Sequence, residues 1–151
     1  MTLLDINAYT LFLHLHSVIR WVVLILAVIV TIKSMMGMFG NPVYGKLDNI
    51  FSAAYVGLMD LMFLIGLILY VFLSPITQSA FNDFGAAMSN ASIRFWAVEH
   101  ITVMILAIAL AHIGRSKAKK TADVKKKYKF QAIFFGISFL LMLVGIPWDR
   151  F

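Results

Sequence analysis

Two histidines, His16 and His100, are the residues whose type and spacing point most directly to chemistry. They belong to two different apolar stretches, about 9 Å and about 12 Å from the expected outer ends of two helices, at 1.5 Å per residue. Buried imidazoles that face each other from neighbouring helices are what a b-type haem iron needs as axial ligands. The sequence therefore predicts one haem iron held by these two side chains.

The elements that must position these histidines are membrane helices. The chain is 62% hydrophobic and 13% charged, whereas soluble domains are roughly 45–50% apolar. Four apolar stretches, at about 9–32, 50–73, 92–114 and 130–146, are each long enough to cross a hydrocarbon core of about 30 Å. Backbone groups in lipid must be paired within helices or closed barrels, and these stretches are too long for barrel strands. We predict an all-α, integral membrane, antiparallel four-helix bundle in which residues 1–151 form a single domain.

The basic residues predict how this bundle is oriented. Eight of the thirteen Lys and Arg fall within residues 115–129, which we expect to be a cytoplasmic loop under the positive-inside rule. Lys33 and Lys46 place the first connection on the same side, whereas residues 73–91 contain no Lys or Arg and lie outside. Both termini are then outside (N-out and C-out), and the first span stays as an anchor and is not a cleaved signal peptide.

The composition also excludes several classes of function. The net charge of +6 comes largely from the basic segment at residues 115–129. This segment suits anionic lipid head groups, and we expect no nucleic-acid binding because no aromatic stacking platform accompanies it. The chain contains no cysteine, which excludes disulfides, thiolate catalysis, iron–sulfur clusters and covalently attached c-type haem.

Charged residues within the spans predict a polar network beside the histidines. Arg20 follows His16 by four residues and shares its helix face. A charge near the bilayer midplane must face the bundle interior, because exposing it to lipid costs at least about 2.5–3.5 kcal/mol. We expect Asp60, which reaches the same depth, to pair with Arg20, and Glu99 could also join this network. Such a network either fixes the helix register or relays protons and tunes a cofactor.

Other ligand assignments are less favoured. His14 projects nearly opposite His16, and His112 is twelve residues from His100, so His112 and His100 point about 120° apart on one helix. A zinc or copper site without porphyrin would need three or four ligands, and no third histidine or cysteine shares this depth. The plain alternative is that each imidazole forms a hydrogen bond within the bundle. Arg94, at the outer end of the third span, is the expected partner of a haem propionate, as is Arg20 if the porphyrin extends inward.

Three segments of the chain resemble small four-helix bacterial membrane proteins labelled cytochrome b-like. The segments are LHLHSVIRW (13–21), RFWAVEHITVMILAIALAHIGRSK (94–117) and GIPWDR (145–150). Their most specific parts are H-S-x-x-R-W, R-F-x-x-x-E-H and the I-P-W ending. The positions that match these motifs are His16, Arg20, Arg94, Glu99 and His100. The resemblance implies a haem-binding protein of a bacterial inner membrane. The chain lacks the paired histidines that two helices of large respiratory cytochromes b carry, which argues against two haems and against quinol oxidation by their mechanism.

These observations favour a non-catalytic membrane subunit over an independent enzyme. The leading hypothesis is a b-type cytochrome-like subunit that carries electrons through one haem b, in the lipid bilayer and near other subunits of a respiratory or redox complex. The alternative is a haem-free accessory or scaffold subunit in which Arg20, Asp60 and Glu99 form a structural network. Movement of protons or small solutes through these three residues is a third hypothesis.

Overall fold

The computed structural model describes residues 3–40 and 43–148, which form helices and contain no β-strand. Four helical segments are long and apolar enough to cross a membrane: Asn7–Phe39, Lys46–Leu73, Ala91–Lys120 and Val124–Gly145. The expectation of an all-α protein with four long apolar helices is confirmed. This composition and these lengths indicate a multi-pass membrane protein.

The four long segments are built from α-helices and two short π-helical stretches. Helix α1 (Leu3–Phe39) forms the first, and α2 (Lys46–Ile68) continues into the π-helical η1 (Leu69–Leu73). The third begins with α5 (Ala91–Arg94), passes through the π-helical η2 (Phe95–Glu99) and continues as α6 (His100–Lys120); the fourth is α7 (Val124–Gly145).

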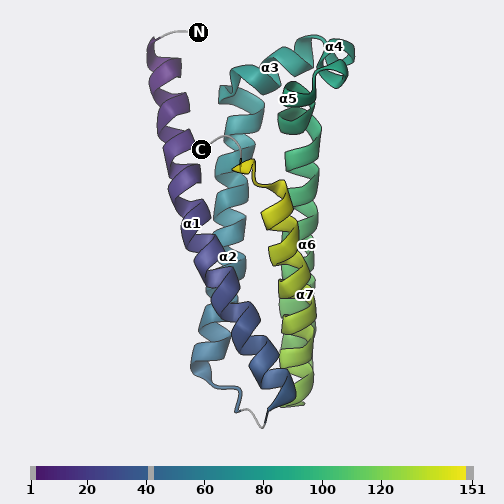
Figure 1. Ribbon diagram of the computed structural model, residues 1–151. Helices are drawn as coiled ribbons and strands as arrows, with labels where there is room; N and C mark the ends of the chain where they lie inside the picture. Colours follow the sequence, from purple (N-terminus) through teal and green to yellow (C-terminus); the bar gives the residue numbers. More distant parts are fainter. Residues whose placement is uncertain (1–2, 41–42, 149–151) are drawn as a thin grey trace.

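Two further short helices, α3 (Pro75–Asn82) and α4 (Phe84–Ser89), connect η1 to α5. Capping side chains explain why the chain restarts a helix here three times. The hydroxyl of Ser74 caps α3, the carboxylate of Asp83 caps α4, and the side-chain oxygen of Asn90 accepts hydrogen bonds at the start of α5. In Figure 1 these helices lie at the same end of the molecule as the start of α1.

Residues 115–129, expected to be a loop, are helical except for residues 121–123. Lysine and arginine are good helix formers, and the basic residues in the last turn of α6 interact favourably with the negative end of its dipole. The Asp123 carboxylate accepts a hydrogen bond from the Lys126 amide at 3.1 Å and so starts α7 again almost at once. The basic connection between the last two spans is therefore largely helical.

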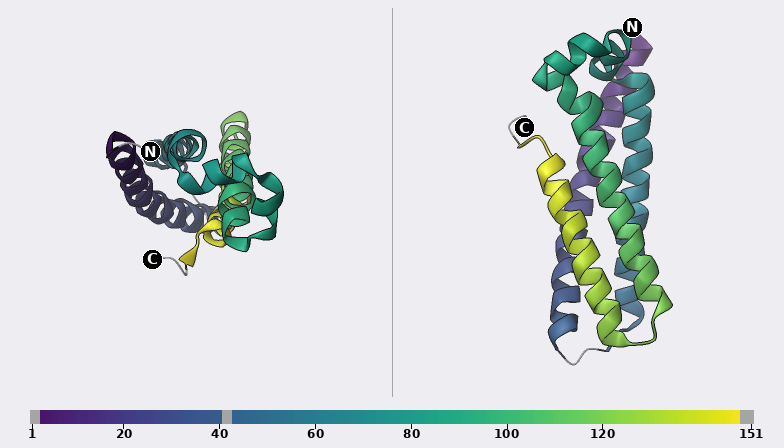
Figure 2. Two further views of the ribbon diagram at one scale, coloured as in Figure 1. Left: turned by 90° about the horizontal axis from the view of Figure 1, so that it is seen from above. Right: turned by 90° about the vertical axis from the view of Figure 1, so that its right-hand side faces the viewer.

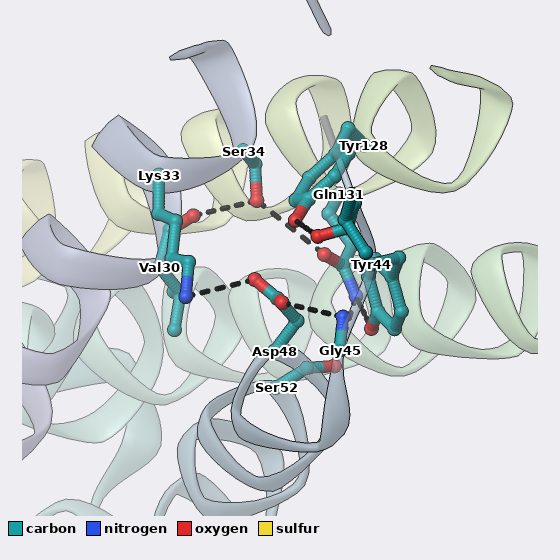
Figure 3. A network of polar contacts seen from close by, with 10 residues as sticks. Val30, Lys33, Ser34, Tyr44, Gly45, Asp48, Ser52, Tyr128 and Gln131 are labelled. Atoms are coloured by element: carbon teal, nitrogen blue, oxygen red, sulfur yellow. Dashed lines mark hydrogen bonds and ion pairs between the residues drawn. The ribbon is translucent and has the colours of Figure 1, made fainter. Parts of the chain in front are cut away.

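A buried polar network closes the end of the bundle where α1 leads to α2 and α6 leads to α7 (Figure 3). Gln131 of α7 lies at its centre. Its amide nitrogen donates to the Tyr44 hydroxyl at 2.9 Å and to Ser52 Oγ at 3.1 Å, and its amide oxygen accepts from Ser34 Oγ at 3.4 Å. Arg115 Nη1 donates to Ser52 Oγ at 2.8 Å. All four long helical segments, or the turn beside them, are thus tied together here.

An ion pair and a close backbone contact strengthen this closed end. Lys33 Nζ lies 3.0 Å from Asp48 Oδ1, and the Gly45 amide donates to Asp48 Oδ2 at 2.9 Å, which fixes the start of α2 on α1. A Cβ at Gly37 would lie 2.5 Å from Cγ of the Tyr128 ring, so the glycine allows this ring to reach the backbone of α1.

Away from the closed end, the core continues through the middle of the bundle, where Tyr55 and Phe135 are fully buried. Ser138 Oγ donates to the Ala107 carbonyl at 2.8 Å, so the Tyr55 hydroxyl, 2.9 Å away, must donate to Ser138 Oγ. These bonds join α2, α6 and α7. Above this level α1 diverges from α7, while α6 and α7 stay side by side (Figures 1 and 2).

Gly114 tests the close packing of α6 on α7. A Cβ at this position would lie 2.6 Å from the Phe134 Cβ, so Gly114→Ala should force the two helices apart and destabilise the fold by about 1–3 kcal/mol. Unfolding in detergent measures this cost. Gly136→Ala is the control, because its Cβ would meet only Thr31 Cγ2 at an ordinary 3.7 Å. Equal stabilities of the two variants would contradict this packing.

Candidate cofactor site

A cavity of about 520 Å³ lies between the parts of α1, α2 and α6 that are far from the closed end, next to the end of α7. Helix α3 covers part of it. Most of its wall is apolar. Its main polar side chains are those of His16, Ser17, Arg20, Tyr70, Thr77 and His100. His16 and Arg20 of the first span and His100 of the third therefore line one cavity.

His16 and His100 lie across this cavity from each other. Their ring centroids are 6.5 Å apart and their ring planes make an angle of 65°. Both side chains are half-buried, and Trp96 flanks the second ring with a centroid distance of 5.4 Å. The matched depth inferred from the sequence thus corresponds to real proximity of the two imidazoles.

A hydrogen bond to the end of α7 orients His100. Its Nδ1 lies 2.8 Å from the Gly145 carbonyl oxygen, which can only accept, so Nδ1 carries the proton and Nε2 keeps a lone pair. A Cβ at Gly145 would lie 2.5 Å from the Met104 Cε. It would also lie 3.2 Å from Val103 Cγ1, so α7 packs closely on α6 at this point.

The π-helical stretch η2 also sets the direction of His100. The His100 amide donates to the Phe95 carbonyl five residues earlier, not four, which adds one residue to the turn. The Tyr70 hydroxyl of η1 donates to the Ala97 carbonyl of η2 at 2.6 Å, and Thr77 Oγ1 donates to the Tyr70 carbonyl at 2.6 Å. The two π-helical stretches thus support each other, and π-turns of this kind are frequent at functional sites.

His16 lies against α2 at a glycine. A Cβ at Gly66 would lie 3.1 Å from His16 Cε1 and 3.5 Å from Nδ1, so this edge of the ring faces α2. The ring lies beside the backbone of Met62. Among the described residues, Nδ1 is buried and has no hydrogen-bond partner within standard distance and angle limits. Gly66 provides the room for an imidazole at this point.

Arg20 brings a positive charge to the same cavity, one turn along α1 from His16. It is the one Lys or Arg among the described residues that line the cavity. Its Nη2 donates to Ser17 Oγ at 3.2 Å, and its guanidinium carbon lies 5.3 Å from the centroid of the Trp21 ring. The wall is therefore cationic on the α1 side.

The expected network of Arg20 with Asp60 and Glu99 was wrong, because both carboxylates pair elsewhere. Asp60 Oδ1 lies 2.7 Å from His112 Nε2, on the outer side of α2 and α6. Glu99 Oε1 lies 2.8 Å from Arg94 Nε, at a spacing of five residues that the π-turn of η2 brings onto one face.

Arg94 also differs from its expected role at the cavity. Its Nη1 donates to the Met88 carbonyl at 3.1 Å and its Nε to Glu99, so it links α4 and η2. It is not among the described residues that line the cavity. Gly66 was expected as one of the small residues that could line the cofactor, whereas Tyr70, which shapes the site through its hydroxyl, had no signal in the sequence.

Tyr70→Phe tests the link between the two π-helical stretches. Removing the hydroxyl leaves the Ala97 carbonyl without its 2.6 Å donor, which should destabilise the protein by about 1–3 kcal/mol in detergent unfolding. Tyr9→Phe is the matched control, since the Tyr9 hydroxyl lines the same cavity and makes no hydrogen bond with any described residue. If the two variants unfold alike, the Tyr70 bond is not a support of the site.

The described residues contain no group of three or more His, Cys, Asp or Glu that could hold a metal ion by itself. Two imidazoles on a largely apolar wall suit a cofactor that brings most of its own metal ligands. Asp149 and Arg150, which end the third resembling segment, lie outside the described residues. No known protein family, curated protein or solved structure matches the chain.

Proposed function

We propose that this protein is a small membrane subunit that holds one b-type haem between α1 and α6, with His16 and His100 as axial ligands. The observation that carries the proposal is the pair of imidazoles 6.5 Å apart across a cavity. When bound, haem supplies reversible one-electron transfer. The role is that of an electron-carrying subunit in or near a respiratory or other redox complex, not that of an independent enzyme.

The two rings are close enough that His16 and His100 would hold the same metal ion. Metal–nitrogen bonds of about 2.0–2.1 Å are compatible with ring centroids 6.5 Å apart. Porphyrin supplies four further nitrogens, so two protein ligands suffice. A zinc ion would need three or four, and the described part of the chain offers no such group.

The surroundings of each ring suit the role of a ligand. The Gly145 carbonyl accepts a hydrogen bond from His100 Nδ1–H, so Nε2 is the nitrogen that would bind the metal. Such a bond also raises the basicity of an imidazole. Gly66 leaves room for His16. Arg20 is the better partner for a propionate, because it lines the cavity and Arg94 does not.

We further propose that the four long segments form an antiparallel bundle in a bacterial inner membrane, N-out and C-out. Basic residues in the last turn of α6 and the first turns of α7 gather at the closed end, which suits the cytoplasmic side. The residues that line the cavity lie away from this end, which places the cavity nearer the outer face. The bilayer and neighbouring membrane subunits are the expected partners.

Histidine substitutions test the ligand assignment. His16→Ala and His100→Ala should each abolish haem retention while the protein still inserts, because one axial ligand is lost. The measurement is the Soret absorption per mole of detergent-purified protein after expression with excess haem. His112→Ala is the control: its partner is Asp60, outside the cavity, so the spectrum should not change.

Two outcomes would contradict this assignment. Loss of haem from His112→Ala, with haem kept by His16→Ala, would move the site to another part of the bundle. Wild-type protein without a Soret band after saturation with haem would favour the other class of function, a haem-free accessory subunit.

Single cysteines test the orientation, since the chain has none of its own. Ser89→Cys, at the end of α4, should react with a membrane-impermeant thiol reagent applied to the outer face of intact cells. Lys119→Cys, in the last turn of α6, should react only after permeabilisation. Both positions are exposed. The reverse pattern would overturn the N-out, C-out arrangement.

A further inference from the structure

One polar pair in the bundle faces away from its interior. Asp60 Oδ1 and His112 Nε2 lie 2.7 Å apart on the outer side of α2 and α6, and their side chains are 44% and 51% exposed. Asp60 is fourteen residues from the start of the Lys46–Leu73 segment and thirteen from its end. It therefore lies near the middle of the span for any reasonable placement of a bilayer around this segment.

Each member of the pair has further hydrogen-bonding capacity. His112 Nδ1 and Asp60 Oδ2 form no hydrogen bond with any residue that the structure describes. In lipid no water can satisfy them, and ionisable groups within spans pair with each other or face protein. When the imidazole carries a proton on both ring nitrogens, the pair presents one N–H donor and one carboxylate acceptor to whatever covers this face.

The backbone next to the pair is accessible to a neighbouring helix. Gly57 is exposed on α2, three residues before Asp60, and a Cβ there would meet nothing within 4 Å. Ala109 is exposed on α6, three residues before His112. Small residues flanking a polar group allow membrane helices to approach closely. We call Gly57, Asp60, Ala109 and His112 the α2–α6 patch.

We propose that the α2–α6 patch binds a second copy of this chain, about a two-fold axis along the membrane normal. Two copies inserted in the same direction present the same residues at the same depth, and a two-fold contact pairs each residue with its complement in both directions. His112 Nδ1 then donates to Asp60 of the partner subunit, and the same bond forms in reverse. The patch carries one donor and one acceptor, so it is complementary to itself in charge and in hydrogen bonding. The dimer does not depend on haem.

Disulfide cross-linking in native membranes tests this dimer. Gly57→Cys and Ala109→Cys are introduced one at a time into the cysteine-free chain, and an oxidant is added. The controls are Ile29→Cys on α1 and Ile133→Cys on α7, which are 43% and 42% exposed. All four positions lie 9–11 residues from the closed end of their helices, or about 14–17 Å at 1.5 Å per residue. The patch variants should form a disulfide-linked dimer of this chain, and the controls should form little.

A second pair of variants ties the dimer to the polar contact. In the Gly57→Cys background, Asp60→Leu with His112→Leu makes the face apolar and should give about tenfold less dimer, equivalent to roughly 1.4 kcal/mol of association free energy. Arg94→Leu with Glu99→Leu removes another exposed ion pair of the same bundle and should leave cross-linking unchanged. If the leucine variant fails to insert, Asp60→Asn, which removes the charge and keeps an oxygen, should still reduce the dimer several-fold.

Several results would overturn the proposal. Equal cross-linking at Ile29 and Ile133 would indicate random collision in the membrane. An adduct whose mass differs from two copies of the chain would identify another protein as the occupant of the patch. Absence of cross-linking at both patch positions, or a dimer unaffected by the Asp60 substitutions, would also exclude this interface.

Discussion

The hydrogen bond from His100 Nδ1 to the Gly145 carbonyl, 2.8 Å long, is the interaction on which the candidate site depends. It joins the end of α7 to the start of α6 and leaves Nε2 of the imidazole with its lone pair. At Gly145 α7 packs closely on α6, where an added Cβ would lie 3.2 Å from Val103 Cγ1 and would displace the flexible end of Met104. The π-turn of η2, which the Tyr70 hydroxyl supports from η1, directs His100 toward this bond. Helix contact, histidine tautomer and backbone irregularity therefore act together at one point.

One end of the bundle fixes the helices relative to one another, and the other end contains the cavity. At the closed end, Gln131 and Ser52 link helices that could otherwise slide, and the Lys33–Asp48 pair fixes α2 on α1. Because the helices are held there, α1 can diverge at the other end without loss of register. The space that opens is lined by long apolar side chains and by two imidazoles. The contacts at the closed end thus leave the cavity between the opposite ends of the helices.

Hydropathy and helical rise were enough to predict the four long helices and to bring His16 and His100 to one level, since residue count along a helix gives depth directly. The rotation of each helix was not predictable in this way. Asp60 reaches the depth of Arg20 but points toward His112 on another side of α2. The π-turns shift the face of every later residue by about one position, which explains why Arg94 meets Glu99 and not the cavity. The basic segment at residues 115–129 is mostly helical because lysine is a good helix former as well as a polar residue suited to water.

An iron held by both His16 and His100 would be recognised in the electron paramagnetic resonance spectrum of the oxidised, haem-saturated protein. Two imidazole ligands make ferric haem low-spin. The wild-type protein should therefore give a low-spin signal, with one haem per chain, and this signal should be lost or replaced by a high-spin signal in His100→Ala. A low-spin signal that survives both His16→Ala and His100→Ala, or a wild-type protein that shows only high-spin ferric haem, would contradict ligation by these two residues.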